Sequence, residues 1–411
     1  MKIFNRKLKI TSSALLTLCM VFVMTACAEN SSQSEKSQPA EQTTVQPTTM
    51  SAEEINDRKL DKFISDMTLE EKVGQMFFIR CPDKDAVQQV SEYNIGGYIL
   101  FGRDFDGKTK DEVVDDINGY QNEADIPLLI GVDEEGGTVV RVSSNPNLRE
   151  TPFLSPKDTY ADGGWDAVKQ DAEEKADLLL SLGINVNLAP VCDMTSNEYG
   201  FMYDRSFSSD VDMENRYVRT VVETSRSKKL GTVLKHFPGY GNNSDTHTGI
   251  AYDDRDCSEF ENTDFKPFYQ GIESGADCIL VSHNIVNCMD SEYPASLSQK
   301  VHDILRNEFK FDGVIMTDDL IMDAITDFTG DEAAAVTAAK CGNDLLCCSS
   351  IDTQYPAVLE AVQNGEIPEA RVDASVKRIL KWKQNLGIFN IDTYQKKVKS
   401  TEPTDTVGSE E

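Results

Sequence analysis

The chain repeats one hydrophobic pattern from residue 74 onward: a short apolar run, a polar turn, and a stretch with the period of an amphipathic helix. The apolar runs cover residues 74–80, 96–102, 127–133, 185–191, 232–237, 277–283, 313–319 and 344–350. Short runs that are apolar throughout are typical of strands buried on both faces, as in a parallel sheet. The remaining periodic segments predict helices over 111–124, 166–183, 214–229, 301–310, 331–340, 355–365 and 369–387.

Eight strands that alternate with helices predict an α/β fold, namely a single (β/α)8 barrel of the TIM type. A doubly wound open sheet is the alternative. In a barrel, functional residues gather at the C-terminal ends of the strands. The polar residues at these ends are Asp133, Asp193, Lys235, His236, His283, Asp318 and Asp319. We therefore expect a polar pocket at this end of the barrel.

The N-terminus has the pattern of a secretory signal. Basic residues precede an apolar stretch at 14–23, and small residues precede Cys27 in the sequence MTAC. This resembles a bacterial lipobox, which predicts a lipoprotein signal peptide over 1–26 and a lipid on Cys27. The protein would then be exported and anchored to the outer face of a bacterial membrane. The alternative is an ordinary signal with an incidental cysteine.

The rest of the chain divides by composition. Residues 27–58 are polar and predict a disordered tether, 59–390 predict the catalytic barrel, and 391–411 predict a polar tail. The net charge of −30 argues against a nucleic-acid partner, and no obligate protein partner is predicted. The cysteines beyond Cys27 form no zinc-type pairs, and several lie in apolar runs, where a thiol behaves as a small core residue. The sequence leaves open whether any of them pair.

Two kinds of chemistry fit the expected pocket. Magnesium on Asp318 and Asp319 is the weaker one, because adjacent strand residues point to opposite faces. Glycoside hydrolysis with retention needs a carboxylate nucleophile and a group that shuttles a proton. Asp318 suits the first role, and His247, which Asp245 can orient, suits the second. The alternative for His247 is a surface histidine on a polar loop.

Several motifs occur in the order found in one known family. They are GVDEEGG (131–137), LAPVCD (188–193), DRSF (204–207), KHFPGYG (235–241) with DTH (245–247), and GVIMTDDL (313–320). Over about 60–390 the chain therefore resembles a family 3 glycoside hydrolase, and more narrowly the β-N-acetylglucosaminidase branch, which the D-x-H element marks.

The resemblance implies a role for each matching residue. Asp318 is the implied nucleophile, His247 the general acid/base and Asp245 its partner. The implied sugar-binding residues are Asp133, Arg141, Arg205, Lys235 and His236. Three features depart from the usual family pattern: Thr138 replaces an arginine, Tyr240 replaces a histidine, and the run between Gly241 and Asp245 is one residue shorter.

Together these observations predict a retaining hydrolase that needs no cofactor or metal. It would remove terminal non-reducing β-linked N-acetylglucosamine (GlcNAc) from peptidoglycan fragments or chito-oligosaccharides. A phosphorylase of β-N-acetylglucosaminides, a β-glucosidase of the same family, and a non-catalytic sugar-binding lipoprotein are the alternatives.

Overall fold

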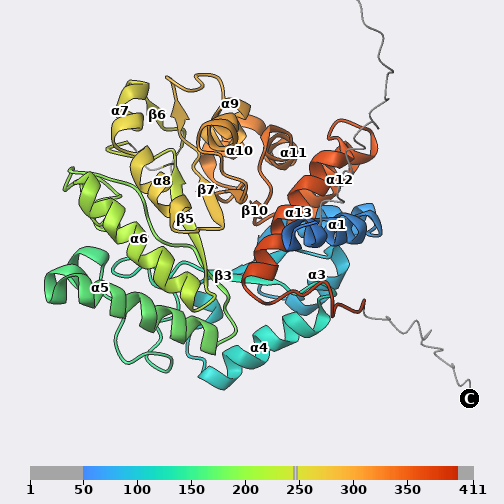
Figure 1. Ribbon diagram of the computed structural model, residues 1–411, viewed down its shortest axis with the longest axis horizontal. Coiled ribbons are helices and arrows are strands. Elements are labelled where there is room, and N and C mark those ends of the chain that lie inside the picture. The colour runs from blue at the N-terminus through green and yellow to red at the C-terminus, as the bar shows by residue number, and fades with distance from the viewer. Residues whose placement is uncertain (1–49, 244–245, 247–248, 397–411) are drawn as a thin grey trace, which may run out of the picture. The chain divides into compact units, whose positions relative to one another are not determined.

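Eight parallel strands form the central sheet of the computed structural model, which describes residues 50–243, 246 and 249–396 (Figure 1). The strands are β1 (Phe77–Arg80), β2 (Gly97–Leu100), β3 (Leu129–Val132), β4 (Val186–Asn187), β5 (Gly231–Phe237), β7 (Cys278–Val281), β9 (Val314–Thr317) and β10 (Leu346–Cys348). Their order is β10-β1-β2-β3-β4-β5-β7-β9. Each predicted apolar run supplies one of these strands.

The first and last strands of this order close the sheet. A parallel bridge joins Met316 of β9 to Leu345, next to β10. The Thr317 backbone N–H donates to the Leu345 carbonyl at 3.2 Å, and the Cys347 N–H donates to the Thr317 hydroxyl at 3.0 Å. With helices around this ring, the predicted (β/α)8 barrel is confirmed.

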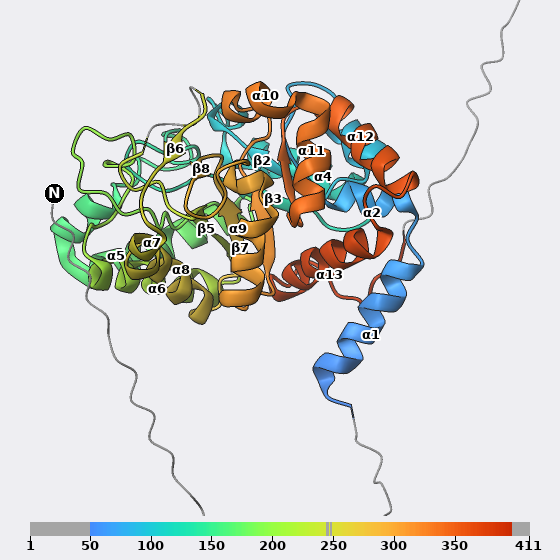
Figure 2. The same cartoon turned by 90° about the horizontal axis from the view of Figure 1, so that it is seen from above.

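Helices surround the strands in Figures 1 and 2. Those that match predicted segments are α4 (Lys110–Glu123), α5 (Pro156–Ser181), α6 (Val211–Ser227), α9 (Gln299–Asp303), α11 (Asp331–Cys341), α12 (Ile351–Gln363) and α13 (Glu369–Asn385). The others are α1 (Ala52–Ser65), α2 (Leu69–Gln75), α3 (Ala86–Tyr93), α7 (Cys257–Asn262), α8 (Phe265–Glu273) and α10 (Asp323–Thr329). A π-helical turn (Ile304–Glu308) follows α9.

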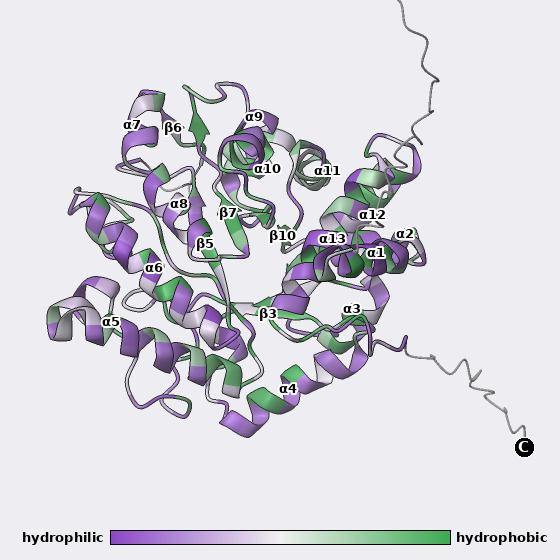
Figure 3. Cartoon of the chain, viewed as in Figure 1, coloured by the Kyte–Doolittle hydropathy of each residue, from purple (hydrophilic) through white to green (hydrophobic). Residues whose placement is uncertain are grey.

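Helix α6 packs its apolar side against the barrel. Tyr217, Val218 and Val222 are buried and pack with Leu234 and Phe237 of β5. Figure 3 shows the corresponding hydropathy: β5 and β7 are largely hydrophobic, whereas α6 carries both hydrophilic and hydrophobic residues. Burial of these apolar faces drives the helices onto the barrel.

Helix α1 corrects one predicted boundary. The tether expected over 27–58 is wrong at its C-terminal end, because α1 begins at Ala52. The Glu54 N–H donates to the Ser51 hydroxyl at 3.1 Å, and the Ser51 N–H donates to the Glu54 carboxylate at 2.7 Å. This capping box starts the helix, and burial of Leu60 and Ile64 holds it on the domain.

A small parallel sheet and a disulfide lie beside the C-terminal ends of β5 and β7. Strand β6 (Tyr252–Asp253) pairs with β8 (Ile285–Val286). Cys257 and Cys288 follow these strands and form a disulfide, with Cα atoms 5.5 Å apart. The sequence alone left open whether the cysteines pair, and the structure pairs these two; the other cysteines among the described residues are buried.

The predicted signal peptide and Cys27 lie outside the described residues. Within the part of the chain that is described, we find no helix with the length and apolar character that a bilayer crossing requires.

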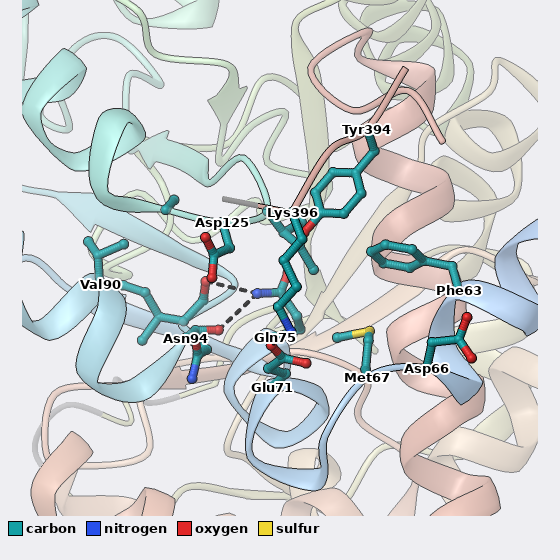
Figure 4. A pocket seen from close by; sticks show the side chains of 13 residues that line it. Phe63, Asp66, Met67, Glu71, Gln75, Val90, Asn94, Asp125, Tyr394 and Lys396 are labelled. Carbon is teal, nitrogen blue, oxygen red and sulfur yellow. Dashed lines mark hydrogen bonds and ion pairs between the residues drawn. The ribbon is translucent and has the colours of Figure 1, made fainter. Parts of the chain in front are cut away.

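A cavity of about 220 Å³ lies near the N-terminal ends of β2 and β3, opposite the expected active site (Figure 4). Phe63, Met67 and Val90 give it an apolar wall. The Gln75 side-chain amide donates to the carbonyls of Asn94 at 2.8 Å and Ile95 at 3.2 Å. None of the strand-end polar residues predicted from the sequence lines this cavity.

Candidate active site

A second cavity, of about 480 Å³, opens at the C-terminal ends of the barrel strands. Every strand of the barrel contributes to it, directly or through the residue that follows. Its lining residues are Arg80, Ile99, Phe101, Asp133, Glu135, Val139, Arg141, Leu188, Arg205, Lys235, His236, Leu280, Asp318, Asp319, Ile321, Met322, Asp323 and Cys347. The chain thus gathers charged groups around an apolar floor where barrel enzymes carry their active sites.

This cavity contains most of the site residues predicted from the sequence: Asp133, Arg141, Arg205, Lys235, His236 and Asp318 all line it. Asp245 and His247, by contrast, lie outside the described residues. Asp193 and His283, the other strand-end residues, are fully buried behind the cavity wall.

Glu135 links Lys235 and Arg205, two of the basic side chains that line the cavity. Its carboxylate accepts from Lys235 Nζ at 2.7 Å and from two nitrogens of Arg205, at 2.8 and 3.0 Å. Lys235 also donates to Asp133 at 2.6 Å. The side chains of Lys235 and Glu135 are only 3% and 2% exposed, so these charges compensate one another with little help from water.

The charges in this cluster shift one another's pKa values. Burial alone would raise the pKa of Glu135, but Lys235 and Arg205 hold it well below its usual range. Burial would lower the pKa of Lys235, but Asp133 and Glu135 outweigh it and raise that pKa. The carboxylate of Glu135 and the ammonium of Lys235 therefore both stay charged at neutral pH.

His236 has a partner at each ring nitrogen. Nδ1 lies 2.7 Å from the Asp193 carboxylate, and Nε2 lies 3.2 Å from an Arg205 nitrogen. Because a guanidinium can only donate, Nε2 is the acceptor and Nδ1 carries the hydrogen. Asp193 also accepts from the His236 backbone N–H at 3.0 Å. His236 thus orients Arg205 at the cavity wall, in addition to lining the cavity itself.

Asp318 and Asp319 follow β9 and have different surroundings. Asp318 lines the cavity, and its carboxylate accepts from the Asp319 N–H at 2.9 Å. Asp319 accepts from the Ser349 hydroxyl and from the Ile321 N–H, which agrees with a local structural role. Burial raises the pKa of Asp319.

His283 is one of the strand-end residues that were expected at the pocket. Its Nδ1 lies 2.7 Å from the Ser296 hydroxyl, and its Nε2 lies 3.0 Å from the Asp319 carbonyl. Since it does not line the cavity, we assign it to the support of the Asp318–Asp319 turn.

Arg80 and Phe101 are cavity residues that the sequence interpretation missed. The Arg80 guanidinium lies 4.5 Å from the centre of the Phe101 ring, and that of Arg141 lies 5.8 Å from it. The Nε atoms of both arginines are buried without a hydrogen-bond partner among the described residues. Arg80 ends the first apolar run, so the strand-end rule could have identified it.

The described residues contain no recognisable metal site. Within the described ranges, no three His, Cys, Asp or Glu side chains are grouped as metal ligands would be. The buried acids near the cavity are instead occupied by basic side chains, hydroxyls or backbone N–H groups.

The fold and this cavity define a class of protein: a barrel enzyme whose strand-end carboxylates and paired cations face one polar pocket. Comparison with known proteins makes the class specific. Residues 68–382 match the glycosyl hydrolase family 3 N-terminal domain. The chain therefore belongs to glycosyl hydrolase family 3, and it is a hydrolase of the β-hexosaminidase kind.

Individual relatives agree with this assignment. The chain is 31% identical over 286 residues to a β-hexosaminidase of Hydrogenovibrio crunogenus, covering 68% of this chain and 79% of that one. It is 31% identical to the β-hexosaminidase LpqI of Mycobacterium tuberculosis, covering 75% and 81%. Its structure is similar to that of a family 3 β-N-acetylglucosaminidase from Paenibacillus, with a TM-score of 0.74 and 30% identity over 84% of this chain and 66% of that one.

Proposed function

We propose that the protein is a retaining β-N-acetylglucosaminidase that removes terminal non-reducing GlcNAc from peptidoglycan fragments or chito-oligosaccharides. The observation that carries this proposal is the barrel-mouth cavity, which gathers Asp318 with the compensated cluster of Asp133, Glu135, Lys235 and Arg205. The names of the similar β-hexosaminidases and of the Paenibacillus β-N-acetylglucosaminidase support the choice of sugar.

In the first step, the Asp318 carboxylate attacks the anomeric carbon and the bond to the leaving oxygen breaks. His247, oriented by Asp245, donates its proton to that oxygen. In the second step, His247 takes a proton from water, whose oxygen attacks the anomeric carbon and releases Asp318. The product keeps the β configuration because the carbon is inverted twice.

The sugar would be held by the charged cluster. Asp133 offers an acceptor for hydroxyl groups, while Lys235, Arg205 and Arg141 offer charge-assisted donors. His236 lines the cavity and holds Arg205 in place. Because Glu135 already compensates Lys235 and Arg205, these two cations stay paired when a neutral sugar binds.

The proposal is tested on full-length protein with p-nitrophenyl β-GlcNAc, next to Asp318→Asn and His247→Ala. We expect turnover with wild type and severe loss with both variants. A 5-fluoro GlcNAc glycoside, which slows the second step, should leave its sugar on the peptide that contains Asp318, as read by mass spectrometry. Binding of GlcNAc without turnover by any form would contradict an enzymatic role.

A separate experiment tests whether water or phosphate accepts the sugar from the enzyme. The unpartnered Nε atoms of Arg80 and Arg141 are suitable donors to phosphate, so the reaction should be run in water and in phosphate buffer. A hydrolase gives free GlcNAc in both, whereas GlcNAc 1-phosphate in the second would identify a phosphorylase. Faster turnover of p-nitrophenyl β-glucoside would favour the β-glucosidase alternative.

We also propose that the protein is an exported lipoprotein attached to the membrane through Cys27. The basic, apolar and small-residue pattern before Cys27 supports it, as does the disulfide between Cys257 and Cys288, since disulfides persist in oxidising compartments. Labelled palmitate should enter the wild-type chain and not Cys27→Ser. Equal labelling of both would contradict the assignment.

A further inference from the structure

A cavity of about 490 Å³ with a basic lining lies at the N-terminal ends of β9 and β10, at the opposite end of the barrel from the candidate active site. Its charged lining residues are Arg306, Lys310, Asp312, Lys340, Arg371 and Arg378. They come from the π-helical turn, the segment that leads into β9, α11 and α13. We call this space the basic cavity. The whole chain has 40 basic and 70 acidic residues, so an excess of cations around one cavity runs against its composition.

Helix α13 leaves space between two arginines of the basic cavity. Arg371, Ala374 and Arg378 occupy positions i, i+3 and i+7, which share one face of a helix, and all three line the cavity. The alanine has only a methyl group as its side chain. The two guanidinium groups therefore stand about two turns apart on α13 with a short side chain between them.

A single buried carboxylate holds three of these arginines. Asp344 is fully buried, and it accepts from Arg378 at 3.3 Å, from Arg371 at 3.4 Å, and from Arg306. Burial alone would raise the pKa of Asp344, but the three arginines hold it below its usual value. One negative charge cannot compensate three guanidinium groups, so positive charge is left over at the wall of the cavity.

The remaining acids near the basic cavity are exposed to water. Asp312 lies 3.1 Å from Arg378 and its side chain is 81% exposed, and Glu366 lies 2.8 Å from Lys340 and is 47% exposed. Ion pairs as exposed as these contribute little. Burial lowers the pKa of Arg306, and the nearby Arg378 and Arg371 lower it further, against the opposite effect of Asp344. The cations of the cavity thus repel one another without full compensation.

We propose that the basic cavity is a binding site for a phosphate group. Guanidinium groups match the oxygens of a phosphate with parallel hydrogen bonds. A phosphate monoester carries a charge of about −1.5 to −2 at pH 7, which compensates more of the surplus than one carboxylate does. The cavity is larger than a phosphate ion needs, so the group would be carried on an organic molecule, either a soluble phosphate monoester or a phospholipid headgroup.

This site is separate from the sugar site. The basic cavity and the cavity at the C-terminal strand ends have no lining residue in common. The inference therefore does not depend on the proposed function, and it can be tested by binding alone.

Calorimetric titration of the full-length protein with inorganic phosphate and with glycerol 3-phosphate, at low ionic strength, tests the site. We expect a Kd of about 1 mM or lower for at least glycerol 3-phosphate. Arg378→Gln should raise that Kd about tenfold or more, because a charge-assisted hydrogen bond is lost. The variant should still fold, since Arg306 and Arg371 continue to compensate Asp344.

Two further variants separate the cavity from general attraction. Ala374→Leu fills the space between the two arginines without a change of charge, and it should abolish binding. Lys340→Gln, at an exposed position that does not endanger the fold, should raise Kd about threefold or more.

Lys228→Gln is the matched control for Lys340→Gln. Lys228 also lies 2.8 Å from a carboxylate, that of Asp177, and its side chain is 36% exposed against 45% for Lys340. It does not line the basic cavity, so its loss should leave Kd unchanged. Equal weakening by the two lysine variants would reduce the effect to net charge and overturn the proposal.

A vesicle experiment distinguishes the two sources of the phosphate. Cys27→Ser protein, which has no site for a lipid anchor, is sedimented with phosphatidylcholine vesicles that contain or lack phosphatidic acid. Capture only with phosphatidic acid, lost in Ala374→Leu, would identify a headgroup site, whereas binding of glycerol 3-phosphate without capture would identify a soluble ligand. The absence of both would overturn the proposal. So would binding that Arg80→Ala abolishes and Ala374→Leu does not, since the phosphate would then occupy the sugar site.

Discussion

Replacing Glu135 by glutamine keeps the shape of the side chain and removes the charge that links Lys235 to Arg205. Glu135 accepts at 2.7 Å from Lys235 and at 2.8 and 3.0 Å from Arg205. Removing one partner of a buried ion pair costs about 3–5 kcal/mol. This is a large part of the roughly 5–15 kcal/mol that stabilises a typical domain, so we expect a folded but much weakened protein.

Activity should fall together with stability. Lys235 and Arg205 lose their common carboxylate, and misplacement of positioning groups by about 1 Å can lower the rate about 100-fold. The measurements are urea unfolding at pH 7 and kcat/KM with p-nitrophenyl β-GlcNAc well below the melting temperature. Because the folded pKa of Glu135 is depressed, its contribution is present above the unfolded pKa of about 4.3 and lost as pH falls below it. The stability gap between wild type and variant should therefore shrink in acid.

Glu134→Gln is the control, because the neighbouring glutamate is equally buried and binds no cation. It accepts from the backbone N–H groups of Arg141 at 2.9 Å and Val142 at 2.7 Å, which a glutamine oxygen can still satisfy in part. We expect a smaller loss of about 1–3 kcal/mol. If Glu135→Gln unfolded no more easily than Glu134→Gln and kept its activity, the reasoning about the paired cations would be refuted.

Three further changes have defined outcomes. Burial lowers the pKa of Lys383 to about 7, so wild-type stability should rise from about pH 7 to 10.5 as the unfolded chain loses its proton. Lys383→Met should flatten that rise in a series of denaturation curves, while it also removes the donor to the Gln75 side-chain oxygen at 2.7 Å. An unchanged slope would contradict the lowered pKa of Lys383. Replacing Cys257 and Cys288 by serine should cost about 3 kcal/mol of unfolding free energy, and reductant should lower the melting temperature of wild type alone. Arg80→Ala should raise KM by about tenfold, equivalent to 1.4 kcal/mol, and an unaltered KM would exclude Arg80 from substrate binding.

The barrel could be predicted from the sequence because parallel strands covered on both faces are apolar at every position. Runs such as GVIMTDD and DCILVSH therefore indicate both a strand and its functional end. Helix α1 was missed because its capping box, Ser51 to Glu54, lies in a segment whose composition is otherwise polar. A capping box of four residues is too short to predict a helix in a segment of such composition.

Much of the site's geometry could not be predicted without the structure. Glu135 contacts Arg205, 70 residues away in the sequence, and Lys235, 100 residues away (235 − 135). No local sequence pattern predicts such a pairing. The Cys257–Cys288 disulfide was equally hidden, since spacing alone does not choose among several cysteines.

Between β9 and β10 a side chain adds to the backbone hydrogen bonds that close the ring of strands. Between β9 and β10 the hydroxyl of Thr317 takes the place of a backbone acceptor for Cys347, and Asp318, the proposed nucleophile, is the very next residue. Loss of the hydrogen bond from the Cys347 N–H to the Thr317 hydroxyl on warming would displace Asp318 while the other strands remain paired. Catalysis should therefore fail at a lower temperature than the fold, and Thr317→Val should widen the interval between the two.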